Sequence, residues 1–299
     1  MKILSFGSMN IDNTYSVDEF VQPGETMTAK NLSKFCGGKG LNQSIALASA
    51  GADVAHFGCV GEDGDILLDM LKSRGVNTDS VIKIDNITSG HAIIQVDSHG
   101  QNSILLYPGA NRRMTPELID RELEKYSCGD WLLIQNETNC LEYIIRAANK
   151  KGMKIAFNPS PMDETVSTLP LELVDLFLEN EIEGAAVTGK EITEEITAEF
   201  EKLFPNAAVI LTLGKKGSIF KSEKDMLFQP SYCGTVKDTT GAGDTYTGFF
   251  IANYIKGVSP QECMRIAAMA STVQISRDGA AIAIPTKQEV LNALKNHCR

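Results

Sequence analysis

The chain has 299 residues, of which 43% are apolar and 22% are charged. This composition is typical of a globular protein with a sizeable core, and it excludes disordered and fibrous classes. The net charge of −10 argues against nucleic acid and acidic membrane surfaces as partners, because both require clustered Lys and Arg.

Short apolar runs alternate with segments of helical period along most of the chain. This is the pattern of a doubly wound, mostly parallel α/β sheet with crossover helices on both faces. In chain order, the predicted strands are Ile3–Gly7, Val54–Val60, Trp131–Gln135, Lys154–Asn158, Ala185–Thr188 and Val209–Leu213.

The predicted helices lie between these strands and after the last of them. Three of them are each followed by a glycine suited to the left-handed position that ends a helix, namely Asn42–Ala50, Asp65–Arg74 and Leu141–Lys151. The C-terminal third is predicted to contain the helices Thr245–Lys256, Gln261–Ile275 and Lys287–Asn296.

Two regions interrupt this rhythm by alternating polar and apolar residues. They are Thr26–Phe35, and Gly90–Val96 joined by a turn signal to Ser103–Tyr107. The pattern predicts a small antiparallel sheet from roughly residues 12–36 and 89–108, and it leaves open whether these strands edge the main sheet or form a lid over a ligand. Because no linker divides the chain, we expect one α/β domain over residues 1–299.

Seven cysteines occur without a CxxC pair and mostly within apolar stretches, which predicts reduced core thiols of a cytosolic protein. The N-terminal segment reaches Asp12 before an apolar run of signal-peptide length develops. No later segment has the length and apolar character of a membrane span. We therefore expect a cytoplasmic location and no membrane partner.

The strongest local motif runs from Lys237 to Thr245 and reads Lys-Asp-Thr-Thr-Gly-Ala-Gly-Asp-Thr, just before a predicted helix. Its consecutive small residues allow backbone N–H groups to face an anion, and the helix N-terminus adds its positive end. Asp244 would then point at an incoming hydroxyl. Taken alone, the same residues also fit an ordinary helix cap after a turn.

A second Gly-rich motif, Gly-Gly-Lys-Gly-Leu-Asn-Gln-Ser at residues 37–44, leads into a predicted helix, and Lys39 and Asn42 offer donors for sugar hydroxyls. Asn10 and Asp12 follow the first strand, at the sheet edge where open α/β proteins bind ligands. Walker A spacing and GxGxxG are both missing from the sequence, which argues against a P-loop enzyme or a dinucleotide oxidoreductase.

Four segments together resemble the signatures of the ribokinase (PfkB) family of carbohydrate kinases. They are Gly-Ser-Met-Asn-Ile-Asp at 7–12, Pro-Gly-Glu-Thr at 23–26, Gly-Gly-Lys-Gly-Leu-Asn-Gln at 37–43 and Asp-Thr-Thr-Gly-Ala-Gly-Asp-Thr at 238–245. Their order and spacing are those of the family, and they span nearly the whole chain.

The resemblance implies a role for each matching position. Asp244 corresponds to the catalytic base, with Gly241, Ala242 and Gly243 as its anion hole. The implied sugar contacts are Asn10, Asp12, Gly38, Lys39, Asn42 and Glu137. The implied nucleotide contacts are Asn180, Thr212, Gly214 and Gly243, with Glu183 organising Mg²⁺ through water.

Family members are also typically activated by a monovalent cation such as K⁺, which the resemblance places near Asp238 and Thr240. A late serine completes that site in familiar examples, and Ala283 stands in its place here, so the resemblance leaves cation activation open. The protruding sheet implies a homodimer formed lid to lid.

Within the family, Gly-Gly-Lys-Gly-x-Asn-Gln is closest to ribokinases. It implies transfer of the γ-phosphoryl group of ATP to the hydroxymethyl group of a small sugar, first of all D-ribose. Deoxyribose, a keto-sugar such as fructose, a deoxy-keto-gluconate or a nucleoside are alternative substrates. A catalytically idle sugar-binding protein on the same scaffold is the alternative from another class.

Overall fold

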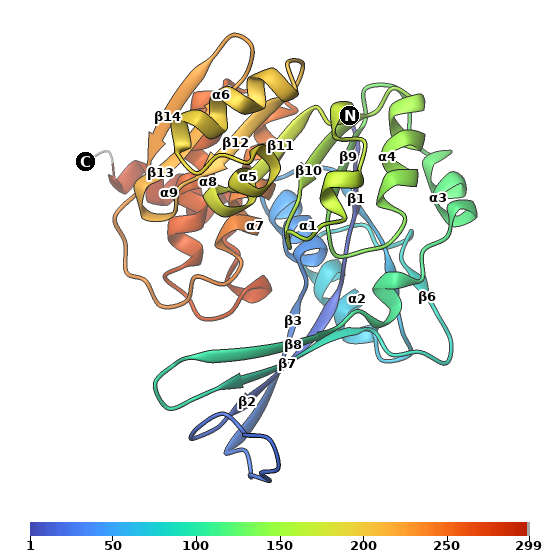
Figure 1. The fold of residues 1–299 in the computed structure, drawn as a ribbon, viewed down its shortest axis with the longest axis vertical. Helices are drawn as coiled ribbons and strands as arrows, with labels where there is room; N and C mark the ends of the chain where they lie inside the picture. Colours follow the sequence, from blue (N-terminus) through green and yellow to red (C-terminus); the bar gives the residue numbers. More distant parts are fainter. Residues whose placement is uncertain (298–299) are drawn as a thin grey trace.

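The computed structural model describes residues 1–297 and centres on one eight-stranded sheet with the order β14-β13-β12-β11-β10-β9-β1-β4 (Figure 1). The six strands from β12 to β4 run parallel, and β13 and β14 add antiparallel at one edge. The strands are β1 Ile3–Phe6, β4 Val54–Phe57, β9 Trp131–Gln135, β10 Lys154–Asn158, β11 Leu176–Asn180, β12 Ala208–Thr212, β13 Gly217–Lys221 and β14 Met226–Pro230. The predicted mostly parallel α/β sheet is confirmed.

Helices cover both faces of this sheet because its buried strands present apolar side chains alternately to either side. In β11, Leu176 and Leu178 face one core, whereas Phe177 faces the other. The first core is closed by α1 Lys39–Ser49, α2 Asp65–Ser73, α7 Ala242–Tyr254, α8 Pro260–Gln274 and α9 Lys287–His297. The second is closed by α3 Pro116–Leu123, α4 Leu141–Lys150, α5 Glu181–Thr188 and α6 Thr193–Leu203.

One predicted strand is wrong. Residues Ala185–Thr188 belong to helix α5, and the strand of this unit is β11, which ends at Asn180. The Asn180 side chain accepts hydrogen bonds from the N–H groups of Ile182 and Glu183, and Glu183 Oε2 accepts one from Asn180 N. This reciprocal capping box starts a helix where the apolar run of Ala185–Thr188 alone favoured a strand.

Two further details differ from the sequence-based prediction. The predicted strand Val54–Val60 divides into β4 and the short β5, Cys59–Val60, which pairs with β6, Ile82–Lys83. The antiparallel strands β13 and β14 were not predicted. Burial alternates along both strands, but the buried positions include the polar Ser218 and Gln229, so no regular polar–apolar alternation marks them in the sequence.

A separate four-stranded sheet, with the order β3-β2-β7-β8, stands away from the main sheet at the bottom of Figure 1. Its strands are β2 Asn10–Ser16, β3 Asn31–Gly37, β7 Gly90–Val96 and β8 Asn102–Tyr107. The pairs β2–β3 and β7–β8 are antiparallel, and the parallel pair β2–β7 joins them. Asn10 and Asp12, predicted to follow the first strand, therefore begin this second sheet.

Helices α1 and α7 pack unusually closely, and this contact positions the site. A Cβ atom at Gly248 would lie 2.3 Å from the Cβ of Ala46, so only glycine permits the approach. Helix α7 begins at Ala242 and α1 at Lys39. The crossing therefore brings the first turns of two helices together, although about 200 residues separate them in sequence.

The cysteines only partly follow the prediction. All six within residues 1–297 are free thiols, and Cys36, Cys59 and Cys263 are buried. Cys128 and Cys233 are exposed, so their predicted core location is wrong; both lie in loops rather than in the apolar elements beside them. Cys298 lies outside the described residues. No described helix combines the length and apolar character needed to cross a bilayer.

Candidate active site

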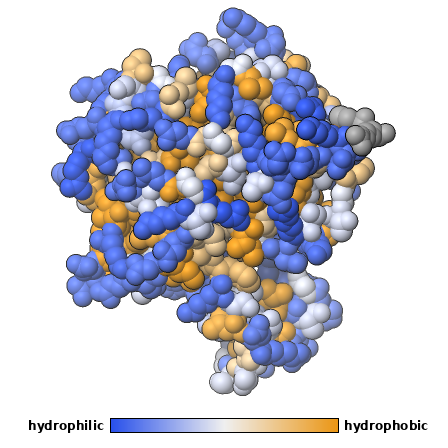
Figure 2. Space-filling view, turned by 180° about the vertical axis from the view of Figure 1, so that it is seen from behind, coloured by the Kyte–Doolittle hydropathy of each residue, from blue (hydrophilic) through white to orange (hydrophobic). Residues whose placement is uncertain are grey.

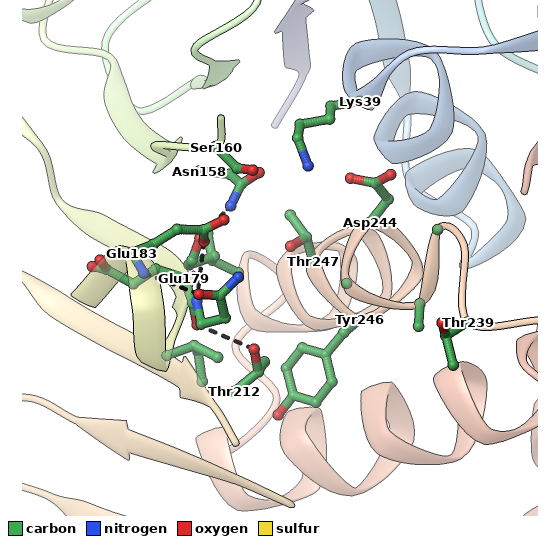
Figure 3. Close-up of a pocket in the computed structure, with 16 residues that line it drawn as sticks. Lys39, Asn158, Ser160, Glu179, Glu183, Thr212, Thr239, Asp244, Tyr246 and Thr247 are labelled. Atoms are coloured by element: carbon green, nitrogen blue, oxygen red, sulfur yellow. Dashed lines mark hydrogen bonds between the residues drawn. The ribbon is translucent and has the colours of Figure 1, made fainter. Parts of the chain in front are cut away.

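A cavity of about 240 Å³ lies between the carboxyl ends of β10, β11 and β12 and the N-terminus of α7 (Figure 3). This is the edge at which parallel α/β sheets bind ligands. Its lining includes Lys39, Asn158, Ser160, Glu179, Asn180, Glu183, Thr212, Thr239, Gly241, Gly243, Asp244 and Thr247.

The small-residue motif forms the N-terminus of helix α7. Gly241 is the N-cap residue and adopts the left-handed conformation with φ of 78°, which glycine adopts without strain. The N–H of Ala242 donates to the carbonyl of Thr239 at 3.2 Å. The first turn of α7 lines the cavity through Gly241, Ala242 and Gly243, at the positive end of the helix dipole, an arrangement suited to a phosphoryl group.

Asp244 sits in that first turn, and its carboxylate is held from two sides. Oδ2 accepts from Asn42 Nδ2 and Oδ1 accepts from Gln43 Nε2, each at 2.9 Å. Gln43 is fixed in turn, because its Oε1 accepts from Gln135 Nε2 at 2.8 Å and its Nε2 also reaches Asn158 Oδ1 at 3.2 Å. The carboxylate therefore has a defined orientation toward the cavity.

Gln43 is the positioning residue that the sequence analysis missed. It ends the Gly-Gly-Lys-Gly-Leu-Asn-Gln motif, so its place in that motif was the available signal. Asn42 is implied as a sugar contact, but its side-chain amide donates a hydrogen bond to Asp244. Its Oδ1 is a buried acceptor that has no partner in residues 1–297. A hydroxyl donor of a ligand would satisfy that oxygen.

Lys39 and Glu137 meet at the start of α1. Glu137 Oε2 accepts from the backbone N of Lys39 at 2.9 Å and from the hydroxyl of Ser8. The Lys39 side chain extends the other way, into the cavity, where Figure 3 shows it pointing in alongside Asn158 and Asp244. The backbone of Lys39 thus contacts Glu137, whereas its side chain lines the cavity together with the N-terminus of α7.

The other implied sugar residues lie just beyond the cavity lining, on β2 and at the α1 N-terminus. Burial and the nearby Glu137 carboxylate raise the pKa of Asp12 from 3.8 to about 6. Asn10 is buried and its Oδ1 accepts from Asn111 Nδ2 at 2.8 Å. Gly38 is the N-cap residue of α1, with φ of 92°.

With the sugar contact that the resemblance implies for Asp12, this raised pKa predicts a pH effect on sugar binding. Ionised Asp12 accepts hydrogen bonds from hydroxyls on both oxygens, whereas the protonated form loses part of that capacity. As pH falls through about 6, KM for sugar should rise by up to about tenfold per pH unit, with KM for ATP nearly constant. Steady-state kinetics between pH 5 and pH 8 at constant ionic strength measure this.

The matched variant Asp12→Asn should show a high KM for sugar that does not change over the same range. Acid unfolding through Asp12 does not explain the effect, because a carboxyl whose pKa is raised on folding favours the folded state at low pH and loses that contribution as pH rises through about 6. A KM for sugar that stays flat in the wild type would contradict the assignment.

The implied nucleotide and metal residues divide between cavity and surface. Asn180, Glu183 and Thr212 line the cavity, whereas Gly214 is exposed beyond the end of β12. Besides capping α5, Glu183 is buried at the cavity wall. The hydroxyl of Thr212 donates to the carbonyl of Glu179 at 3.2 Å, which joins the ends of β11 and β12.

Glu179 is a second acid that the sequence analysis did not single out. It is almost fully buried at the end of β11, and neither carboxyl oxygen has a hydrogen-bond partner among the described residues. Burial, reinforced by the nearby Glu183, raises the pKa of Glu179 well above its ordinary value. Its only sequence signal was a charged residue inside an apolar strand.

Asp238 and Thr240 lie in the loop before α7, outside the cavity lining. Asp238 Oδ1 accepts from Thr240 N at 2.9 Å, and its Oδ2 accepts from Gly279 N at 3.0 Å. Partial burial raises the pKa of Asp238, but these hydrogen bonds outweigh it and hold the pKa below its ordinary value. The carboxylate therefore fastens the segment around Gly279 to the loop.

A helix N-terminus for a phosphoryl group, a buried and oriented carboxylate beside it, and polar groups beyond that carboxylate define an enzyme that transfers phosphoryl groups to a hydroxyl. Comparison with known proteins agrees with this class. The sequence pattern described as "pfkB family carbohydrate kinase" matches residues 1–287. The chain belongs to this family.

Three relatives illustrate the similarity. The chain is 33% identical to a ribokinase of Haemophilus influenzae over 97% of both sequences, and 29% identical to a deoxyribokinase of Salmonella typhi over the same shares. Among solved structures, Arabidopsis thaliana ribokinase complexed with ribose and ATP superimposes with a TM-score of 0.87, at 30% identity and over 98% of both chains.

Proposed function

We propose that this protein is an ATP-dependent ribose kinase that forms ribose 5-phosphate. The observation that carries the proposal is the Asp244 carboxylate, held by Asn42 and Gln43 between the α7 N-terminus and the polar residues of β2. The similarity to ribokinases over nearly the full chain supports ribose as the sugar.

In this mechanism, Asp244 accepts the proton of the hydroxymethyl group as the oxygen attacks the γ-phosphorus. The bond from that phosphorus to the β,γ-bridging oxygen breaks, and ADP leaves. The transition state is loose, so positioning and charge stabilisation do most of the work. The N–H groups at the start of α7 and the ammonium of Lys39 stabilise the charge on the transferring oxygens. Asp12 and Asn10, together with Glu137, orient the sugar from the opposite side.

Mg²⁺ accompanies ATP in this proposal. The Glu183 carboxylate at the cavity wall is a hard oxygen donor and fits a contact with the hydrated ion. Bound there, Mg²⁺ would neutralise phosphate charge. Asn180 and Thr212 lie beside Glu183, where they can contact the phosphates and the nucleotide.

A substrate panel with coupled ADP detection tests the function. We expect the highest kcat/KM with D-ribose, and lower values with deoxyribose, fructose, deoxy-keto-gluconate and nucleosides. A higher kcat/KM with deoxyribose would reassign the enzyme within its family. If none of these sugars stimulated ADP release, the chain would instead be a sugar-binding protein on this scaffold.

We further propose that the four-stranded sheet is a lid over the sugar and joins two copies of the chain, which we place in the cytoplasm. Figure 2 shows apolar side chains on this protruding lobe, at the bottom of the view. Strand β8 exposes Ile104 to 54%, Leu105 to 67% and Leu106 to 55%. Because successive side chains of a strand point to opposite faces, these apolar residues lie on both faces of the sheet. A lid that is only covered by solvent does not require this much exposed apolar surface.

Sedimentation velocity tests the dimer. The wild type should sediment as a dimer, and the double variant Ile104→Lys/Leu105→Lys, with one charge on each face, should sediment as a monomer. Val236→Lys is the control, because Val236 is also 60% exposed but lies outside the lid. A monomeric wild type would rule the proposal out.

A further inference from the structure

A buried amide lies directly beneath the loop that leads into α7. Gln274, the last residue of α8, is completely buried, and its Nε2 donates to three backbone carbonyls. The oxygens of Thr240, Gly279 and Ala280 lie at 2.9, 3.1 and 3.2 Å from it. Three carbonyls from two separate loops therefore converge on one side-chain nitrogen.

The surrounding contacts hold this arrangement in place. Asp238 ties Thr240 to Gly279 through the backbone N–H groups of both residues. The three carbonyl oxygens can only accept hydrogen bonds, so the amide directs its nitrogen at them. Its Oε1 then accepts from the hydroxyl of Thr245 at 3.4 Å. Both the loops and the orientation of the amide are thus fixed.

A ring of backbone carbonyls is the environment that proteins use to replace the hydration shell of K⁺. The resemblance placed a monovalent cation at this loop, near Asp238 and Thr240. The residues present do not fit such an ion, because the amide nitrogen of Gln274 already lies within hydrogen-bonding distance of all three carbonyl oxygens. Ala283, where a serine would complete the site, is buried and offers no side-chain oxygen.

We propose that the Gln274 amide replaces the activating monovalent cation, so that this kinase is independent of K⁺. Its N–H groups satisfy the same carbonyls that an ion would bind, without requiring an ion from solution. The consequence reaches the active site, because Thr240 immediately precedes Gly241, the N-cap of α7. The amide therefore positions the backbone that holds the transferring phosphoryl group.

The first test uses the wild-type enzyme, and its kinetic part rests on the proposed kinase function. ADP release with ribose is measured at constant ionic strength in KCl, NaCl or tetramethylammonium chloride, with ATP supplied free of K⁺ and Na⁺. We expect equal rates in all three salts. Specific stimulation of the wild type by K⁺ would overturn the proposal.

Two variants of Gln274 distinguish the loss of its N–H donor from the loss of its side-chain volume. Gln274→Ala removes the amide and opens the carbonyl ring, and it should lose about tenfold or more of its turnover in tetramethylammonium chloride and recover with K⁺. Gln274→Met keeps most of the volume without a donor, so it should lose turnover and show no K⁺ rescue. Equal K⁺ responses of the two variants would contradict the proposal.

A measurement of thermal stability tests K⁺ binding without relying on the proposed kinase activity. K⁺ should raise the Tm of Gln274→Ala above its value in tetramethylammonium chloride, and it should leave the Tm of the wild type unchanged. If no sugar is phosphorylated, this comparison still decides whether the amide fills a cation site. If Gln274→Ala does not fold, a K⁺-dependent rise in wild-type Tm overturns the proposal and its absence supports it.

Discussion

Asp244→Asn should reduce kcat by about 10²–10⁴-fold, the usual contribution of a positioned general base, with KM for sugar changed little. The substitution keeps the shape of the side chain, but the amide cannot accept the proton of the attacking hydroxyl. It also places one NH₂ group against the amide donors of Asn42 and Gln43. Steady-state and single-turnover kinetics with ribose provide the measurement.

Asp278→Asn is the matched control for this experiment. Asp278 lies in the loop next to Gly279, its side chain is 86% exposed, and it should not affect turnover. A near wild-type kcat for Asp244→Asn would exclude Asp244 as the base. Equal losses in the two variants would point to a general effect of reduced negative charge near the site.

Lys39→Met should reduce kcat by about 10²–10³-fold, comparable to the removal of one oxyanion donor. The sequence motif implied a sugar contact for Lys39, whereas the structure places its side chain in the cavity with the α7 N-terminus and Asp244. In the proposed mechanism, an ammonium there stabilises charge on the transferring phosphoryl group more than it binds ground-state sugar. Methionine keeps the length of the side chain and removes the charge.

The loss should appear mainly in kcat, with a smaller rise in the KM for sugar. Lys72→Met, on the exposed end of α2, is the control that removes one positive charge far from the cavity. A large rise in KM for sugar with kcat unchanged would instead assign Lys39 to sugar binding alone, as the resemblance implied.

Much of the fold was predictable because its signals are local. Strands β9 and β10 match their predicted bounds, and the glycines after α1, α2 and α4 adopt the left-handed conformation. The strand predicted at residues 185–188 was wrong because a competing local signal, the capping box of Asn180 and Glu183, starts a helix there. A short run such as Ala-Ala-Val-Thr is compatible with either a strand or a helix, and the cap decided between them.

The site was predictable where one short segment carries the chemistry. The Gly241–Asp244 turn and the Gly-rich entry to α1 follow from backbone conformations that their own residues favour. The partners of these segments were not predictable from pattern. Gln43 reaches Asp244 across 201 positions of sequence, and Glu179 is recognisable as an isolated acid only when its surroundings are known.

The sequence by itself thus determined the alternating α/β pattern, and it pointed to the small-residue turn as a candidate anion site with Asp244 as its acid, since these depend on local conformation and on the order of apolar residues. Only the tertiary structure decided that Gln43 holds Asp244 by a hydrogen bond, that Lys39 lines the cavity beside it and that Gln274 donates to backbone carbonyls of the loop before α7. Each of these contacts joins segments far apart in the chain, and close packing of helices and loops, which no local pattern encodes, brings them within hydrogen-bonding distance.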